Sequence, residues 1–271
     1  MSQMMNVSLQ TLHRLNEEKK AIQAAFGRAA QTYDASAAFQ RRVGHQLMAC
    51  CTDWMGKTVL DLGCGTGYFT QQLLNEGASV IALDLSDKML EKAWKRCGNQ
   101  AVYIAGDAEC LPLPDNCLDA AFSSLALQWC DDLSVPLREL KRVVKPGGKI
   151  YFTTLLEGSL EELKQAWRGV KGESHVNAFL SLKQVNIALA QAKCNHTHIE
   201  CRTVMERYPS ALALMKDLKG IGATHLREGR SAGLVGRRTF IELEDAYGEF
   251  KLDDGELPAT YKVCFGTIDN E

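Results

Sequence analysis

The chain has 271 residues, of which 46% are hydrophobic and 24% are charged, and these proportions are ordinary for a folded globular protein. Its formal net charge of −2 gives no general affinity for nucleic acid or an acidic membrane, and no run of 18 apolar residues would span a bilayer. The first 20 residues are polar and contain no apolar signal core, so we expect a cytoplasmic protein.

The thiol and imidazole side chains do not form a metal-binding pattern. None of the ten cysteines forms a Cys-x-x-Cys pair, and most lie within apolar segments, as expected of small buried side chains in a reducing compartment. Five histidines have no metal-ligand spacing to nearby acids or cysteines: His13, His45, His175, His196 and His198. We therefore expect neither a metal nor a disulfide framework.

The N-terminal part is predicted to be helical, with one helix from Glu17 to Ala30 and another from about Ala37 to Cys51. Tyr33 lies in the short segment between them. Because this segment precedes a glycine-rich turn, we expect residues 17–55 to lie over a site at that turn, with Tyr33 closing it. The alternative is that Tyr33 packs beneath the N-terminal helices.

From residue 58 onward, short apolar strands alternate with amphipathic helices. Ser86 is expected to cap the helix that follows the second strand. Continuous apolar strands separated by helices indicate a mostly parallel α/β sheet that helices cover on both faces. The predicted strands of this part are 58–62, 79–83, 101–105, one within 118–127, and 149–155.

After Leu155 the alternation changes. Ser159 and Glu162 match the capping box of a helix start. We interpret residues 1–271 as a single domain, in which 156–258 contains helical cap insertions between closing strands of the same sheet. The remaining predicted elements are helices around 181–192, 209–218 and 233–250, and strands at 198–207 and 260–268.

The most informative stretch is Asp61-Leu-Gly-Cys-Gly-Thr-Gly67, between the first strand and its helix. Glycines at every second position permit a sharp turn and leave the main chain open to a ligand at the helix N-terminus. Tyr68 occupies the third glycine position of a dinucleotide fingerprint, and no phosphate-binding lysine follows the turn. The turn is therefore neither a typical NAD site nor a P-loop.

Acidic residues follow the next two strands. Asp84 ends the second strand, 21 residues after Gly63, where a carboxylate suits the hydroxyls of a ribose. Asp107 follows the third strand and precedes Ala108, where it is placed to accept from an adenine amino group. Each acid alone is more typical of a solvated loop or a helix cap. With Asp61, three acids at the carboxyl ends of consecutive strands favour a nucleoside ligand.

These motifs resemble the class I S-adenosylmethionine-dependent methyltransferases over roughly residues 55–155, on segments 61–67, 83–90, 106–112 and 142–148. The resemblance implies a three-layer, Rossmann-like fold whose seven-stranded sheet ends in an antiparallel strand. It also implies S-adenosylmethionine as the cofactor. The implied cofactor-binding residues are Asp61, Gly63, Cys64, Gly65, Gly67, Asp84, Leu85, Asp107, Ala108 and Ser124.

Outside this core, segments 25–34, 124–130, 152–159 and 218–230 are similar to the malonyl-acyl-carrier-protein O-methyltransferases of biotin synthesis. This resemblance covers nearly the whole chain after residue 17, and the extra N-terminal residues are a departure. It implies methylation of the free malonyl carboxylate, which starts synthesis of the pimeloyl precursor of biotin. A carboxylate is ionised at neutral pH, so this reaction needs no general base.

Five residues are candidates for the acceptor side. Lys219, His225 or Arg230 is expected to hold the malonyl carboxylate. Tyr33, which precedes the turn, and Gln128, which follows the fourth strand, are further candidates. Stretch 216–238 carries six basic residues against two acidic ones, so we expect it to dock malonyl-acyl-carrier protein. The alternative is an ordinary solvated helix face. We expect a monomer.

Two other functions stay open on the residues alone. A methyltransferase acting on a quinone precursor or another small molecule would use the same core. It would be expected to have a base or an apolar slot for its acceptor, in place of the cations of 216–238. A protein that binds S-adenosylmethionine without catalysis would also keep the turn and the three acids.

Overall fold

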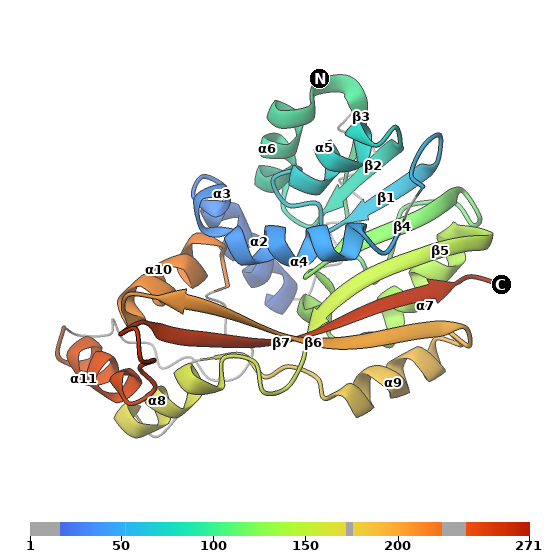
Figure 1. The fold of residues 1–271 in the computed structure, drawn as a ribbon. Helices are drawn as coiled ribbons and strands as arrows, with labels where there is room; N and C mark the ends of the chain where they lie inside the picture. Colours follow the sequence, from blue (N-terminus) through green and yellow to red (C-terminus); the bar gives the residue numbers. More distant parts are fainter. Residues whose placement is uncertain (1–16, 52, 172–175, 224–236) are drawn as a thin grey trace.

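The computed structural model describes residues 17–51, 53–171, 176–223 and 237–271, and it forms a three-layer α/β domain around one seven-stranded sheet (Figure 1). The strand order is β3-β2-β1-β4-β5-β7-β6, and β7 runs antiparallel to both of its neighbours. The predicted sheet with an antiparallel last strand is confirmed. The strands are β1 (Thr58–Leu62), β2 (Ser79–Asp84), β3 (Ala101–Ala105), β4 (Leu118–Ser124), β5 (Val144–Leu155), β6 (Thr197–Tyr208) and β7 (Leu257–Asp269).

Helices cover both faces of the sheet, as the continuous apolar strands predict. Alternate residues of a strand face opposite sides, so Val59 packs on the face of α4 and α5, and Leu60 packs on the face of α7 and α9. The helices are α2 (Glu17–Ala29), α3 (Tyr33–Ser36), α4 (Ala38–Met48), α5 (Tyr68–Asn75), α6 (Asp87–Cys97), α7 (Ser134–Val143), α8 (Glu161–Lys171), α9 (Leu182–Gln191), α10 (Ala211–Gly220) and α11 (Arg237–Gly248), with 3₁₀ turns η1 (Gly98–Gln100) and η2 (Leu127–Trp129).

Strands β6 and β7 extend beyond the parallel strands, and α8, α10 and α11 gather around their far end (Figure 1). Trp167 of α8 and Tyr247 of α11 are fully buried there. The Tyr247 hydroxyl donates to the Pro258 carbonyl at 2.7 Å, which ties α11 to the start of β7. All three helices belong to the stretch in which helical insertions were predicted.

The capping box predicted at Ser159 and Glu162 is wrong. The Ser159 hydroxyl donates to the Leu156 carbonyl, and the Glu162 carboxylate accepts from the hydroxyl and amide of Thr260 in β7. Helix α8 begins only at Glu161, so these two side chains fix the helix to the sheet instead of closing its first turn.

Two smaller predictions also differ from the structure. Ser86 stands at the N-cap position of α6, but its side chain makes no capping hydrogen bond. Strand β5 begins at Val144 and not at Lys149, because Val144 already pairs with Leu118 of β4, before an irregularity that separates this pair from the regular pairing that starts at Lys149. A capping box occurs instead at α9, between Ser181 and Gln184.

Candidate functional site

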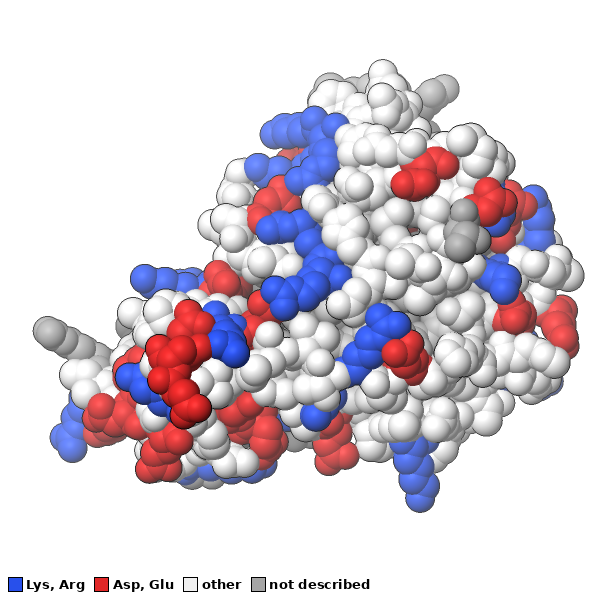
Figure 2. Space-filling view, viewed as in Figure 1, with Lys and Arg blue, Asp and Glu red and all other residues white. Residues whose placement is uncertain are grey.

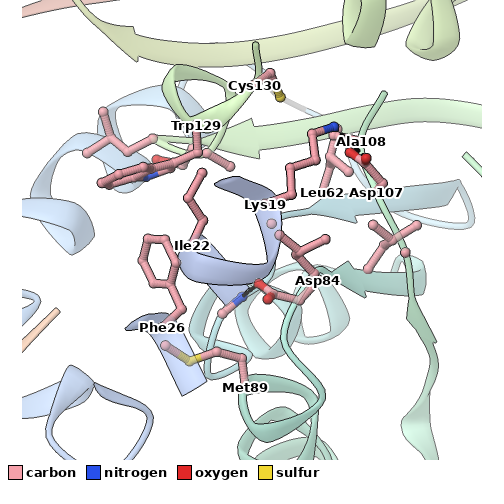
Figure 3. Close-up of a pocket in the computed structure, with 18 of the residues that line it drawn as sticks. Lys19, Ile22, Phe26, Leu62, Asp84, Met89, Asp107, Ala108, Trp129 and Cys130 are labelled. Atoms are coloured by element: carbon pink, nitrogen blue, oxygen red, sulfur yellow. Dashed lines mark hydrogen bonds and ion pairs between the residues drawn. The ribbon is translucent and has the colours of Figure 1, made fainter. Parts of the chain in front are cut away.

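A cavity lies at the carboxyl ends of β1, β2, β3 and β4, and helices α2 and α3 cover it (Figure 3). This is where open α/β sheets bind ligands. We call it the first cavity. Its lining consists of Lys19, Ile22, Phe26, Tyr33, Leu62, Gly63, Gly65, Leu83, Asp84, Leu85, Met89, Gly106, Asp107, Ala108, Ser124, Leu125, Ala126, Trp129 and Cys130.

The glycine-rich turn presents bare main chain to this cavity. Gly63 has φ of +72°, and a Cβ added there would stand 2.3 Å from the Cβ of Ala126. Gly65 has φ of +55°, and its missing side chain leaves space in front of the Tyr33 ring. Positive φ angles and close approach both require glycine here, so the turn leaves space for a ligand against the backbone.

Asp84 connects this turn to the second strand. One carboxylate oxygen accepts from the Gly65 amide at 2.9 Å, and the other accepts from the Ser86 amide at 2.8 Å. Burial raises the pKa of Asp84 to about 6, although both backbone hydrogen bonds lower it. The carboxylate keeps free lone pairs toward the cavity, which can accept from two neighbouring hydroxyl groups.

Asp107 also lines the cavity, but Lys19 of α2 already binds it. The Lys19 ammonium forms an ion pair with the carboxylate of Asp107 (Figure 3) and a second one with the carboxylate of Glu109. The other oxygen of Asp107 accepts from the Glu109 amide at 3.0 Å. A ligand amino group at Asp107 would therefore share the carboxylate with Lys19.

Three of the predicted cofactor residues do not line the cavity. The buried Asp61 carboxylate accepts from the Thr70 hydroxyl at 2.6 Å and faces α5. The Cys64 thiol is buried, and a Cβ added to Gly67 would lie 2.7 Å from the Cα of Ala93. These three residues support the turn on the side away from the cavity. The predicted residues that do line the cavity are Gly63, Gly65, Asp84, Leu85, Asp107, Ala108 and Ser124.

Polar contacts tie α3 to the glycine turn. The Asp34 carboxylate accepts from the Thr66 hydroxyl at 2.6 Å and from the Arg96 guanidinium at 2.5 Å. These bonds place the neighbouring Tyr33 in the lining of the first cavity. Burial, followed by the nearby carboxylates of Asp84 and Asp34, raises the pKa of Tyr33 far above its ordinary value, so its hydroxyl stays protonated.

A second cavity adjoins the first. The two share four lining residues, Phe26, Tyr33, Leu125 and Trp129, so these side chains form the wall between them. The Phe26 and Trp129 rings meet edge to face, with centroids 5.2 Å apart. The rest of the second cavity is formed by Phe39, Gln40, Gln128, Leu155, Leu160, Val176, Asn177, Phe179, Leu218, Ile221, Ala223 and Tyr261.

The acceptor-side predictions fall on different parts of this arrangement. Tyr33 and Gln128 line the second cavity. Lys219 is exposed on α10, although Leu218 and Ile221 beside it line the cavity. His225 and Arg230 lie outside the described residues.

Sequence reasoning did not single out Lys19, Ile22 and Met89, which line the first cavity. They stand on helices whose apolar spacing is ordinary, and their position depends on how the helices pack. In the described ranges, no group of three or more His, Cys, Asp or Glu side chains is arranged to hold a metal ion. In the same ranges, no helix is long and apolar enough to cross a membrane.

Comparisons with known proteins agree with this geometry. Residues 60–152 match a family described as a methyltransferase domain. The chain is 46% identical to malonyl-acyl-carrier-protein O-methyltransferase of Yersinia pestis, over 94% of this chain and 92% of that protein. It is 47% identical to the enzyme of the same name from Serratia marcescens, over 93% and 96%.

Solved structures share the fold at low identity. The YcgJ protein from Bacillus subtilis superposes with a TM-score of 0.59 at 16% identity, over 85% of this chain and 99% of that one. The [4+2]-cyclase SpnF gives 0.52 at 19% identity, over 84% and 80%. Because that fold also occurs in a cyclase, the fold alone does not define the reaction.

Proposed function

Since this chain belongs to the malonyl-acyl-carrier-protein O-methyltransferase family, we propose that it transfers a methyl group from S-adenosylmethionine to the free carboxylate of malonyl-acyl-carrier protein. The product is the malonyl methyl ester on the carrier, which starts synthesis of the biotin precursor. The family and fold imply S-adenosylmethionine as the methyl donor.

The observation that carries this proposal is the shared wall of the two cavities. A donor in the first cavity and an acceptor in the second would meet at Phe26, Tyr33, Leu125 and Trp129. Holding two reactants in contact removes much of the entropic barrier to a transfer reaction. The apolar character of the wall also favours exclusion of water from the reacting groups.

The residues of the first cavity fit S-adenosylmethionine. Asp84 keeps acceptor capacity for ribose hydroxyls, and the bare turn at Gly63 and Gly65 leaves room for the rest of the molecule. Asp107 can accept from the adenine amino group beside Lys19. When bound, this cofactor supplies a methyl group activated by its sulfonium centre.

The second cavity suits an acceptor that does not need to lose a proton before the transfer. Among its described lining residues there is no His, Asp, Glu or Lys to remove a proton. Tyr33 stays protonated, and burial also raises the pKa of Tyr261 well above its ordinary value. Both phenols can donate hydrogen bonds but do not serve as bases. A carboxylate needs no base, whereas a phenol or quinol acceptor would.

We propose that Lys219, His225 or Arg230 holds the malonyl carboxylate. Leu218, Ile221 and Ala223 line the second cavity, and this part of the chain leads directly into that segment. Replacing each of the three by Ala, with methylation and cofactor binding measured separately, tests this. Loss of turnover with cofactor binding retained identifies the residue, and full turnover in all three variants would refute the assignment.

We propose that the carrier protein docks on the basic stretch 216–238, whose described members Lys216, Lys219 and Arg238 are exposed. Figure 2 shows another group of Lys and Arg side chains over α4 and α6. Helix α6 carries the exposed Lys88 and Lys95. Lys216→Glu with Arg238→Glu should raise KM for the carrier protein more than Lys88→Glu with Lys95→Glu. The reverse order would move the docking site to α6.

One experiment tests the reaction itself. The protein is incubated with methyl-labelled S-adenosylmethionine and with malonyl-acyl-carrier protein, malonyl-coenzyme A or a quinone precursor in parallel. The expected product is a labelled ester on the malonyl carrier protein. Label in the coenzyme A ester alone would identify coenzyme A, and not the carrier protein, as the malonyl carrier. Label in the quinone alone, or none in any acceptor, would overturn the proposal.

A further inference from the structure

The second cavity contains three amide side chains, Gln40, Gln128 and Asn177, in an otherwise largely apolar lining. Two of them carry the inference. Gln40 comes from α4, and Gln128 comes from η2 after β4. Within the described ranges, the side-chain oxygens of both are buried and accept no hydrogen bond. A buried carbonyl oxygen without a donor is costly, so such a pair in one cavity indicates a ligand that supplies N–H or O–H groups.

The orientation of Gln128 is fixed by the backbone. Its amide nitrogen donates to the Leu125 carbonyl at 2.7 Å, so its oxygen is turned away from that bond. Leu125 has φ of +52°, which is unfavourable for a leucine. Hydrogen bonds from its amide to Thr153 hold this conformation, at 3.0 Å to the hydroxyl. The strained Leu125 therefore holds the Gln128 amide nitrogen through its carbonyl, and the Gln128 oxygen is left available to a ligand.

We infer that the second cavity binds the amide-containing arm of a thioester substrate, and that Gln40 and Gln128 accept hydrogen bonds from its N–H groups. A carboxylate or a hydrocarbon chain carries no donor for these oxygens, whereas an acyl chain linked through a pantetheine-type thiol carries amide N–H groups. The inference rests on the proposed function, since it assigns the part of that substrate that lies behind the carboxylate.

The order of groups along the cavities agrees with this assignment. The reacting carboxylate belongs at the wall shared with the first cavity, beside Tyr33. The apolar side chains of Phe39, Leu155 and Leu160 suit the methylene groups of the arm. Gln40 and Gln128 make this lining selective for chains with amide groups, because an alkyl chain would leave both oxygens without donors.

The test uses three malonyl thioesters that differ in the number of amides. They are malonyl-pantetheine with two, malonyl-N-acetylcysteamine with one and malonyl-pentanethiol with none. For the unaltered protein, kcat/KM should fall by about tenfold for each hydrogen bond lost along this series. Gln40→Met and Gln128→Met keep the length of the side chain but remove the amide. In each variant, the ratio of kcat/KM between malonyl-pantetheine and malonyl-pentanethiol should be about tenfold smaller than in the unaltered protein.

Gln191→Met is the matched control, since Gln191 is exposed on α9 at the opposite face of the sheet. It should keep the full discrimination. Binding of S-adenosylhomocysteine by each variant reports an intact fold. If the unaltered protein methylates all three thioesters with equal kcat/KM, or if both variants discriminate as it does, the inference is wrong while the proposed function stands. If it methylates none of them and no malonyl carrier protein, both fail.

Discussion

Lys19 of α2 lies between Asp107 and Glu109 and forms an ion pair with each, although about ninety residues of chain separate the helix from the two acids. The exposed fraction of these side chains is 7%, 16% and 14%. Few cations in the described ranges are as well buried. Ion pairs thus fix α2 to the segment that follows β3, and the Lys19 ammonium lies where the adenine of the cofactor is expected.

Lys19→Met should destabilise the fold by about 3 kcal/mol, because it leaves two carboxylates facing each other without their cation. The neighbouring Lys20 pairs with Glu17 on the surface, where solvent screens the charges and the ion pair contributes little to stability. Urea unfolding of Lys19→Met and Lys20→Met measures this contrast. Equal losses in the two variants would show that the Lys19 pairs do not hold the helix.

Asp84 should make cofactor binding depend on pH. Burial raises its pKa to about 6 in the unbound protein, and only the ionised form accepts from two hydroxyls with full strength. Affinity for S-adenosylhomocysteine should therefore be constant above pH 7 and fall as the pH drops through about 6. Asp84→Asn should bind about thirtyfold more weakly at pH 8, corresponding to roughly 2 kcal/mol, and lose this pH dependence.

Calorimetric titrations at several pH values between 5 and 8 check this expectation. Asp61→Asn is included, since burial raises the pKa of Asp61 to about 7 and it titrates in the same range. If the unaltered protein and Asp84→Asn show parallel pH dependence, another group controls binding.

Asp61 should lower stability as the pH rises. Its folded pKa of about 7 is above the ordinary value of 3.8, so the folded carboxyl keeps a proton that the unfolded chain releases. Stability is lost between pH 4 and 7, by at most about 1.4 kcal/mol for each unit. Asp61→Asn keeps an oxygen for Thr70 and does not titrate, so its stability should change less over this range.

Urea unfolding midpoints at pH 5 and pH 8 measure the effect. The exposed Asp53 provides the matched control, because Asp53→Asn should follow the unaltered protein. Identical midpoint changes in Asp61→Asn and the unaltered protein would contradict the assigned titration.

The sequence predicts those site residues whose position follows from strand order. Asp84 and Asp107 each end or follow a parallel strand, and parallel strands end at the same edge of a sheet, so both reach the first cavity. Asp61 does not, because successive residues of a strand face opposite sides. Leu62 faces the cavity, and Asp61 faces α5 instead.

Contacts between distant segments could not be predicted in this way. Lys19 stands 88 residues before Asp107, and their ion pair depends on how α2 packs over the sheet. Ser159 and Glu162 have the spacing of a capping box, yet both bind β7, about a hundred residues later. Local patterns give local structure unless a distant backbone competes for the same side chains.

Gly63→Ala should reduce cofactor affinity by more than tenfold, whereas Gly98→Ala should not. Both glycines have positive φ, +72° and +59°, so each substitution introduces backbone strain on the order of 1–3 kcal/mol. At Gly63 the new methyl would also stand 2.3 Å from the Cβ of Ala126, which lines the first cavity. At Gly98 nothing lies within 4 Å. Calorimetry with S-adenosylhomocysteine and urea unfolding separate affinity from stability. Unchanged affinity in Gly63→Ala would show that the cavity tolerates a side chain on the turn.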